Sequence, residues 1–180
     1  DGPFEKIAPS NRVKPMAGTV ASGGTLALSG ATNDAFIAVN RLLKAGATVA
    51  RKDDGTWIVA NNATSRQIIE RAARELGLSF TTGSMTGAQP VKSLRVGLWD
   101  RFGGSMPSGW TRWLLEQYEF QFSVVYPQDL DAGDLNAKYD ALVFVDGAIP
   151  EMRTAGAGPA APGGRGGFGG APDTASLPAE

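Results

Sequence analysis

The stretch Leu-Arg-Val-Gly-Leu-Trp at residues 94–99 decides how the second half of this sequence folds. A short apolar run bounded by polar residues is typical of a buried strand. Two further apolar runs follow at 122–126 and 140–146, and residues with helical patterning separate the three runs. Strands that alternate with helices pair in parallel through right-handed crossovers. We therefore expect residues 94–154 to form an α/β unit with a truncated flavodoxin-like parallel sheet.

The helix predicted between the first two of these strands carries several aromatic residues. We expect Ser108 to cap it, and its large side chains recur at helical spacing. These side chains are Trp110, Trp113, Leu114 and Tyr118. An exposed aromatic face of this kind binds sugars or peptides, but the helical spacing favours packing in the core. Arg112 lies off this face and is expected to pair with Glu116 at i+4.

Residues 24–81 predict a small βαββαβ unit that precedes the parallel sheet. In chain order we expect a strand at 25–28, a helix at 33–45, strands at 48–51 and 56–59, a helix at 64–76 and a strand at 78–80. Asn33 and Thr64 are the expected helix caps, and Asp53-Asp54-Gly55 is a typical hairpin turn. This order predicts an open sheet with both helices on one side.

Three further segments complete the predicted domain organisation. Residues 1–23 hold scattered prolines and glycines and are expected to be a connector, and residues 82–93 a linker. Residues 155–180 are rich in Gly, Pro and Ala, a composition that predicts a flexible segment. The sequence starts with neither a methionine nor a signal peptide, so we expect it to begin inside a longer reading frame.

The composition excludes several kinds of catalytic site. The 180 residues include no cysteine and no histidine, which rules out thiolate or histidine zinc sites and Ser-His-Asp or Cys-His catalysis within this chain. Sites built from carboxylates alone, such as magnesium sites, remain open. The net charge of -1 gives no long-range attraction to nucleic acid or to an anionic membrane. No apolar run is long enough for a transmembrane helix.

Two acidic residues and the loop between them are the candidate ligand site. Asp100 and Asp146 each follow a predicted parallel strand, at the carboxyl edge where such sheets bind ligands. If the two strands are neighbours, both carboxylates can approach a Mg²⁺ ion. Ser105 and Ser108 lie in the loop 102–109 before a helix, whose free N–H groups can hold a small anion. The structural alternative is that the acids face water and the loop caps the helix.

Four segments together resemble a known family. They are Arg-Val-Gly-Leu-Trp at 95–99, Gly-Trp-Thr-Arg-Trp at 109–113, the helix at 33–46 and Gly-Pro-Phe at 2–4. They resemble large bacterial zinc carboxypeptidases of the carboxypeptidase A-like family. The resemblance covers about residues 1–150, the region after the catalytic domain, which includes a glutamine amidotransferase-like domain. The Gly-Trp-Thr-Arg-Trp segment is its most specific part.

The resemblance implies a non-catalytic accessory region of an exported, periplasmic or extracellular metallocarboxypeptidase-like protein. Its partner would be the catalytic domain of the same polypeptide, with no nucleic acid and no membrane involved. It would pack on that domain or shape access to it. Zinc would belong to the parent protein, because without histidine neither the zinc ligands of the family nor an amidotransferase triad can be assigned to this chain. The alternative is a small-anion or Mg²⁺-binding flavodoxin-like module.

Overall fold

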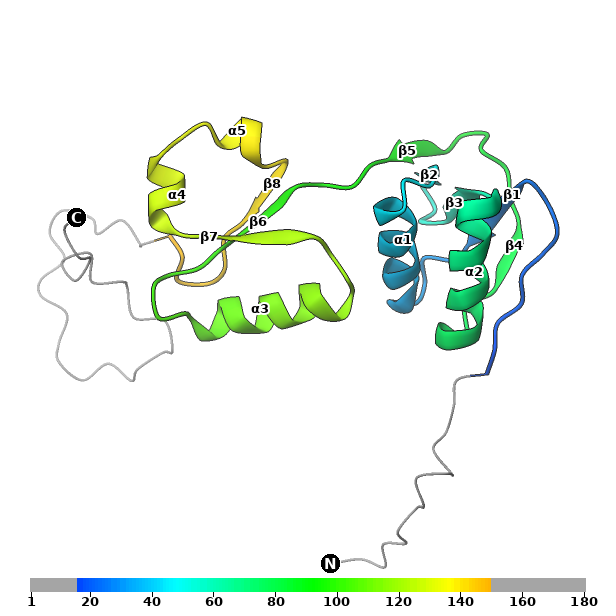
Figure 1. Ribbon diagram of the computed structural model, residues 1–180, viewed down its shortest axis with the longest axis horizontal. Helices are drawn as coiled ribbons and strands as arrows, with labels where there is room; N and C mark the ends of the chain where they lie inside the picture. Colours follow the sequence, from blue (N-terminus) through cyan, green and yellow to red (C-terminus); the bar gives the residue numbers. More distant parts are fainter. Residues whose placement is uncertain (1–15, 150–180) are drawn as a thin grey trace, which may run out of the picture. The chain divides into compact units, whose positions relative to one another are not determined.

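The computed structural model describes residues 16–149 and divides the chain into two compact units, Asp1–Lys92 and Ser93–Glu180 (Figure 1). We call them unit 1 and unit 2. The predictions for residues 1–15 and for the Gly/Pro/Ala-rich segment 155–180 lie outside the described residues. Both units mix helices and strands, as the sequence predicts, but one sheet is antiparallel and the other is parallel.

Unit 1 contains a five-stranded antiparallel sheet in the order β4-β1-β3-β2-β5. Its elements in chain order are β1 (Thr25–Leu28), α1 (Asp34–Lys44), β2 (Val49–Arg51), β3 (Trp57–Ala60), α2 (Ala63–Leu76), β4 (Phe80–Thr82) and β5 (Gln89–Val91). The helices α1 and α2 pack against each other on one side of the sheet (Figure 1). The predicted βαββαβ order is therefore confirmed, with β5 added at its end.

The core of unit 1 lies between this sheet and the two helices. Its largest fully buried side chains are Leu26, Leu28, Leu42, Val49, Val59, Ile69 and Phe80. The N-cap of α2 is Asn62, whose side-chain oxygen accepts hydrogen bonds from the N–H groups of Thr64 and Ser65, each at 3.0 Å. The predicted cap Thr64 is therefore wrong, because it already lies inside the helix. Asn33 is the N-cap of α1, but its side chain makes no capping hydrogen bond.

Two segments predicted as connections are part of unit 1. Within the predicted linker 82–93, residues 89–91 form β5 and pair with β2, at the sheet edge where Pro90 is tolerated. Within the predicted connector 1–23, the Gly18 N–H donates to the Ala73 carbonyl at 2.8 Å and Val20 bridges Phe80. A Cβ atom on Gly18 would lie 2.0 Å from the Leu78 carbonyl oxygen, so only glycine allows this approach.

Unit 2 contains a three-stranded parallel sheet in the order β7-β6-β8. Its elements are β6 (Val96–Trp99), α3 (Met106–Gln117), β7 (Phe122–Val125), α4 (Pro127–Asp131), α5 (Leu135–Lys138) and β8 (Ala141–Val143). Figure 1 shows α3 on one side of the strands and the short helices α4 and α5 on the other. The predicted parallel pairing is confirmed, although β8 is shorter than the predicted strand at 140–146.

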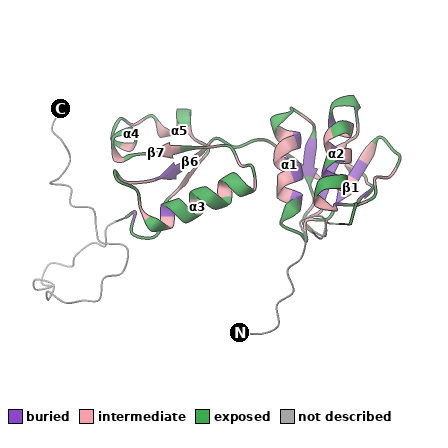
Figure 2. Cartoon of the chain, turned by 60° about the horizontal axis from the view of Figure 1, so that its bottom comes forward, coloured by how far each residue is buried: buried purple, intermediate pink, exposed green. Residues whose placement is uncertain are grey.

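The predicted core face of α3 is wrong for Trp110, Trp113 and Leu114, which are exposed, whereas Tyr118 is half-buried. Figure 2 colours most of this helix as exposed, and Ser108 is its only buried residue. The exposed fractions of Trp110, Trp113 and Leu114 are 62%, 49% and 48%. The side facing the sheet is instead the i, i+3, i+7 row that Ser108 begins, with Thr111 half-buried on it. The sequence shows the helical period but not which row turns inward.

Candidate functional site

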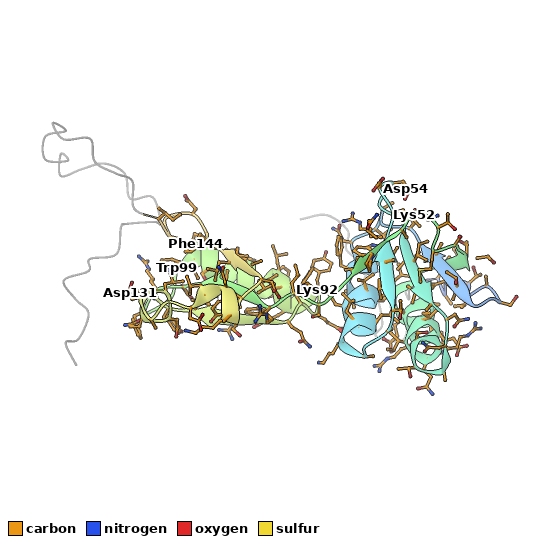
Figure 3. The ribbon with its side chains drawn as sticks, turned by 90° about the horizontal axis from the view of Figure 1, so that it is seen from above. Lys52, Asp54, Lys92, Trp99, Asp131 and Phe144 are labelled. Carbon is orange, nitrogen blue, oxygen red and sulfur yellow. The ribbon has the colours of Figure 1, made fainter. Side chains whose placement is uncertain are left out.

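The carboxyl edge of the parallel sheet holds the acidic residues that the sequence singles out. The strands β6 and β8 are neighbours, with Leu98 opposite Val143, so Asp100 and Asp146 follow adjacent strand ends. Figure 3 shows Trp99 and Phe144, the residues at these ends, at the same end of the sheet. The strand order also reverses here, because the chain passes from β6 to β7 on one side and returns to β8 on the other. Such a reversal is the usual ligand position in open parallel sheets.

The two carboxylates differ in their surroundings. The Asp100 N–H donates to the Val125 carbonyl at 3.0 Å, and one carboxylate oxygen of Asp100 accepts from the Arg101 N–H at 2.8 Å. Asp100 is half-buried, whereas Asp146 is exposed. Within residues 16–149 no three acidic side chains gather in a group that could hold a metal ion. Because Mg²⁺ takes near-octahedral oxygen ligands, two carboxylates would leave most of its shell to water.

The two predicted loop serines are both engaged within unit 2. Ser105 is the N-cap of α3, and its hydroxyl oxygen accepts from the Ser108 N–H at 3.2 Å. Ser108, predicted as the cap, is instead 1% exposed and donates its hydroxyl proton to the Trp99 carbonyl at 3.1 Å. The bond from Ser108 to Trp99 holds α3 on β6. The loop 102–109 therefore caps α3, which is the alternative to a ligand-binding role for Ser105 and Ser108.

An aromatic pair at the same edge was missed by the sequence reasoning. The rings of Phe102 and Tyr126 stack with centroids 5.1 Å apart and an interplanar angle of 11°. Each follows one of two neighbouring strands, β6 and β7, and this placement is the signal that would have found the pair.

The predicted ion pair of Arg112 and Glu116 on α3 is confirmed, with a distance of 2.9 Å between the two side chains. The hydrogen bond to Glu116 raises the pKa of Arg112 above its ordinary value.

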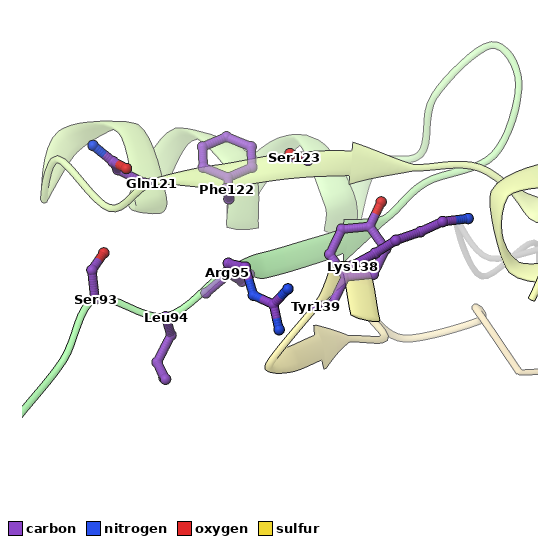
Figure 4. A pocket seen from close by; sticks show the side chains of 9 residues that line it. Ser93, Leu94, Arg95, Gln121, Phe122, Ser123, Lys138 and Tyr139 are labelled. Carbon is purple, nitrogen blue, oxygen red and sulfur yellow. The ribbon is translucent and has the colours of Figure 1, made fainter. Parts of the chain in front are cut away.

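The opposite, amino edge of the parallel sheet contains a cavity of about 420 Å³ (Figure 4). The residues that lead into the three strands line it, and we call it the amino-edge pocket. Its lining consists of Ser93, Leu94, Arg95, Val96, Gln121, Phe122, Ser123, Lys138 and Tyr139. No sequence motif marks this pocket, because its residues are scattered over three separate strand starts.

Arg95 in the amino-edge pocket is anchored by several hydrogen bonds. Its guanidinium donates to the two carboxylate oxygens of Asp140 at 2.9 and 3.1 Å, and to the carbonyls of Asn136 and Ala137. The hydrogen bond that Arg95 donates to Asp140 is the main cause that raises the pKa of Arg95. Lys138 donates to the Gly133 carbonyl at 3.1 Å, a neutral acceptor. The ion pair of Arg95 with Asp140 ties the start of β6 to the start of β8.

The exposed side of α3 forms a third candidate site. Its apolar residues follow the helical i, i+4, i+7, i+8 pattern, and we call them the α3 apolar surface: Met106, Trp110, Trp113 and Leu114. The rings of Trp110 and Trp113 meet edge to face with centroids 5.9 Å apart. A contiguous apolar patch of this kind is typical of an interaction site rather than of ordinary surface.

No protein-family model, no curated protein and no solved structure matches this chain. The resemblance to zinc carboxypeptidases therefore stays a prediction. The residues of this chain do not fit a zinc site, since it has neither histidine nor cysteine. The helices within residues 16–149 include none that is both long and apolar enough to cross a membrane.

Proposed function

We propose that this chain is a non-catalytic accessory region that packs against another protein domain through the α3 apolar surface. The observation that carries the proposal is the exposure of Met106, Trp110, Trp113 and Leu114 along one side of α3. Monomeric proteins rarely leave four large apolar side chains together in water, because each loses the free energy of burial. Tryptophan is also enriched among the residues that dominate binding energy at interfaces.

The geometry of α3 favours a helix-in-groove contact. An amphipathic helix that lays its apolar side into a groove uses anchors at i, i+3, i+4 and i+7. Trp110, Trp113 and Leu114 have this spacing, and the Arg112–Glu116 pair lies at the rim. A partner of this chain would therefore offer an apolar groove.

The resemblance noted in the sequence motivates the identity of that partner. We propose that it is the zinc-dependent catalytic domain of a metallocarboxypeptidase-like exported protein, encoded in the same polypeptide. Unit 2 would then be a flavodoxin-like, amidotransferase-like domain, and its strand order β7-β6-β8 agrees with the first three strands of the flavodoxin-like order. The role of this region would be to pack on the catalytic domain or to shape access to its substrate.

The test begins with the reading frame on both sides of these 180 residues. We expect the upstream part to encode a His-x-x-Glu pair and a later histidine. The polypeptide from the whole frame is then compared with the 180-residue chain by amide hydrogen exchange. Exchange in α3 should be slower in the longer polypeptide, and Trp110→Gln with Trp113→Gln should abolish the difference. A frame without such a domain, or equal exchange in both proteins, would overturn the proposal.

A second candidate function is supported by the neighbouring positions of β6 and β8. Their carboxyl ends bring Asp100 and Asp146 to the reversal point of the sheet, where a small anion or Mg²⁺ would bind in a flavodoxin-like module. Calorimetric titration of the chain with MgCl₂ tests this function. Saturable heat that is lost in Asp100→Asn supports it, and the absence of heat removes it. Ser105 and Ser108 would contribute little, because both already bond within unit 2.

A further inference from the structure

We infer that the amino-edge pocket of unit 2 binds a small organic carboxylate with an apolar body. Its volume of about 420 Å³ lies within the ordinary range for small-molecule sites. The pocket is distinct from the carboxyl edge with Asp100 and Asp146, since it lies where the three strands begin rather than where they end. The inference is also independent of the α3 apolar surface.

The charge of the lining selects an anion. Arg95 and Lys138 are its only side chains that carry charge at neutral pH, and both are cationic. Asp140 balances the charge of Arg95 through their ion pair at 2.9 Å. Lys138 forms no ion pair within residues 16–149 and bonds only the Gly133 carbonyl, which leaves two of its three N–H donors for a ligand. The pocket therefore keeps about one positive charge, which favours a monoanion.

The neutral part of the lining selects the rest of the ligand. Leu94, Val96 and the Phe122 ring provide apolar contact, and Figure 4 shows Phe122 on β7 across from Arg95 and Tyr139. A phosphate or sulfate ion has no apolar portion to fill this side. A carboxylate on an aliphatic or aromatic body satisfies both the ammonium group of Lys138 and the apolar wall.

Other polar groups of the pocket are unused within residues 16–149, and Figure 4 shows Ser93 and Gln121 at the opposite end from the Lys138 ammonium group. The hydroxyl groups of Ser93 and Ser123 and the amide of Gln121 form no hydrogen bond with other described side chains or backbone. Arg95 uses most of its five N–H donors on Asp140, Asn136 and Ala137, so it positions the strand starts rather than holding the ligand. Lys138 is therefore the residue that should bind the carboxylate.

A titration of the full chain followed by ¹H–¹⁵N NMR tests the inference. The probes are 4-phenylbutanoate and the uncharged 4-phenylbutanamide, which share an apolar body. We expect the carboxylate to shift the amide signals of 93–96 and 121–123 in a saturable way, and the uncharged amide to bind about tenfold more weakly, the ratio that corresponds to one charge-assisted hydrogen bond. Added salt should weaken the binding of the carboxylate but not that of the uncharged amide.

Substitution of Lys138 locates the charge. Lys138→Gln should lower the affinity for 4-phenylbutanoate by about tenfold and leave the affinity for 4-phenylbutanamide unchanged. Lys138→Arg should restore the binding of 4-phenylbutanoate. The matched control is Lys44→Gln on α1 in unit 1, which should change nothing. Equal affinity for the two probes in the unchanged protein, no shifts at the pocket, or full carboxylate binding by Lys138→Gln would each overturn the inference.

Discussion

Unit 1 encloses nearly all of its large apolar side chains, whereas unit 2 leaves many of its own exposed. Every residue of the main buried cluster belongs to unit 1, and Met16 is its only exposed large apolar residue among those described. In the described part of unit 2 the buried apolar residues are Leu98, Trp99, Val125 and Ala148. Among residues 93–149 of unit 2, nine large apolar residues are exposed: Leu94, Phe102, Met106, Trp110, Trp113, Leu114, Tyr126, Phe144 and Ile149.

The contrast follows from how each sheet is covered. In unit 1 two amphipathic helices of 11 and 14 residues bury one side of five strands. In unit 2 one long helix lies on three strands with Ser108 as its only buried residue, and its tryptophans are exposed. Since burial of apolar surface is the main favourable contribution to folding, unit 1 should be the more stable unit. Unit 2 should gain stability from a partner.

The strongest test of this contrast is one substitution made in both units. Leu42 on α1 is fully buried, and Leu114 on α3 is 48% exposed. Leu42→Ala should lower the free energy of unfolding of unit 1 by about 2–5 kcal/mol, because it leaves a cavity. Leu114→Ala should change the free energy of unfolding of unit 2 by about 0.5 kcal/mol or less. Amide exchange in urea measures each unit separately, and equal effects would contradict the contrast.

A smaller effect is expected at the centre of the parallel sheet. A Cβ atom on Gly97 would lie 2.7 Å from a methyl carbon of Leu142 and 2.8 Å from one of Val125. These side chains can shift, so Gly97→Ala should destabilise unit 2 by about 1–3 kcal/mol through overpacking and leave unit 1 unchanged.

The same substitution should also disturb the amino-edge pocket, because the new Cβ atom would lie 3.1 Å from a ring carbon of Tyr139. The amide signals of the two units, followed through thermal unfolding, measure the effect of Gly97→Ala. Loss of stability in both units would show that they do not unfold separately.

Helix capping gives a test in which the two units should agree. Asn62→Ala removes the capping box of α2, and Ser105→Ala removes the N-cap of α3. Each should cost its own unit about 1 kcal/mol, since the orphan N–H groups lose an acceptor. Urea unfolding followed by amide exchange measures both variants. If Ser105→Ala leaves the stability of unit 2 unchanged, Ser105 is not the structural cap described above.

The smallest effect concerns an ion-pair network on the surface of unit 1. Glu75 accepts hydrogen bonds from Arg71 at 2.8 Å and from Arg41 at 3.1 Å, and the bond from Arg71 is the main cause that lowers the pKa of Glu75 below 4.5. A lowered carboxyl pKa stabilises the folded state above the unfolded pKa, and this stabilisation is lost as the pH falls through the folded value.

Glu75→Gln should therefore lower the urea midpoint of unit 1 slightly at pH 7, and the difference from the parent should disappear as the pH is lowered well below 4.5. The effect is small because the pair is exposed to solvent. Urea titrations at several pH values between 3 and 7 measure it. A difference that persists in acid would show that Glu75 acts through packing rather than through its charge.

Local sequence patterns predicted the elements of both units and the parallel pairing in unit 2. The alternation of apolar runs with helical stretches, and the turn at Asp53-Asp54-Gly55, are determined by neighbouring residues and are visible in a single sequence. They failed at β5, where a strand of three residues containing Pro90 has no intrinsic preference and forms only because β2 offers an open edge.

The candidate site was harder to predict, because its residues depend on tertiary packing. The sequence placed Asp100 and Asp146 after predicted strands but left open whether those strands are neighbours, which the structure shows. Ser108 turns inward to the Trp99 carbonyl, which no local pattern shows. The amino-edge pocket combines residues from three strand starts far apart in the chain. The direction in which the tryptophans of α3 point also depends on which row of the helix fits the sheet.

The parallel ladder of unit 2 has a consequence for the order of folding. In unit 1 the strands β2 and β3 are joined by a tight hairpin, so they can pair within microseconds. In unit 2 the first hydrogen bonds between β6 and β7 must wait until the whole of α3 lies between them, and β8 arrives later still. Contacts between residues distant in the chain slow folding, because loop-closure entropy is lost before any contact forms. During synthesis unit 1 should therefore reach its folded state before the strands of unit 2 have paired.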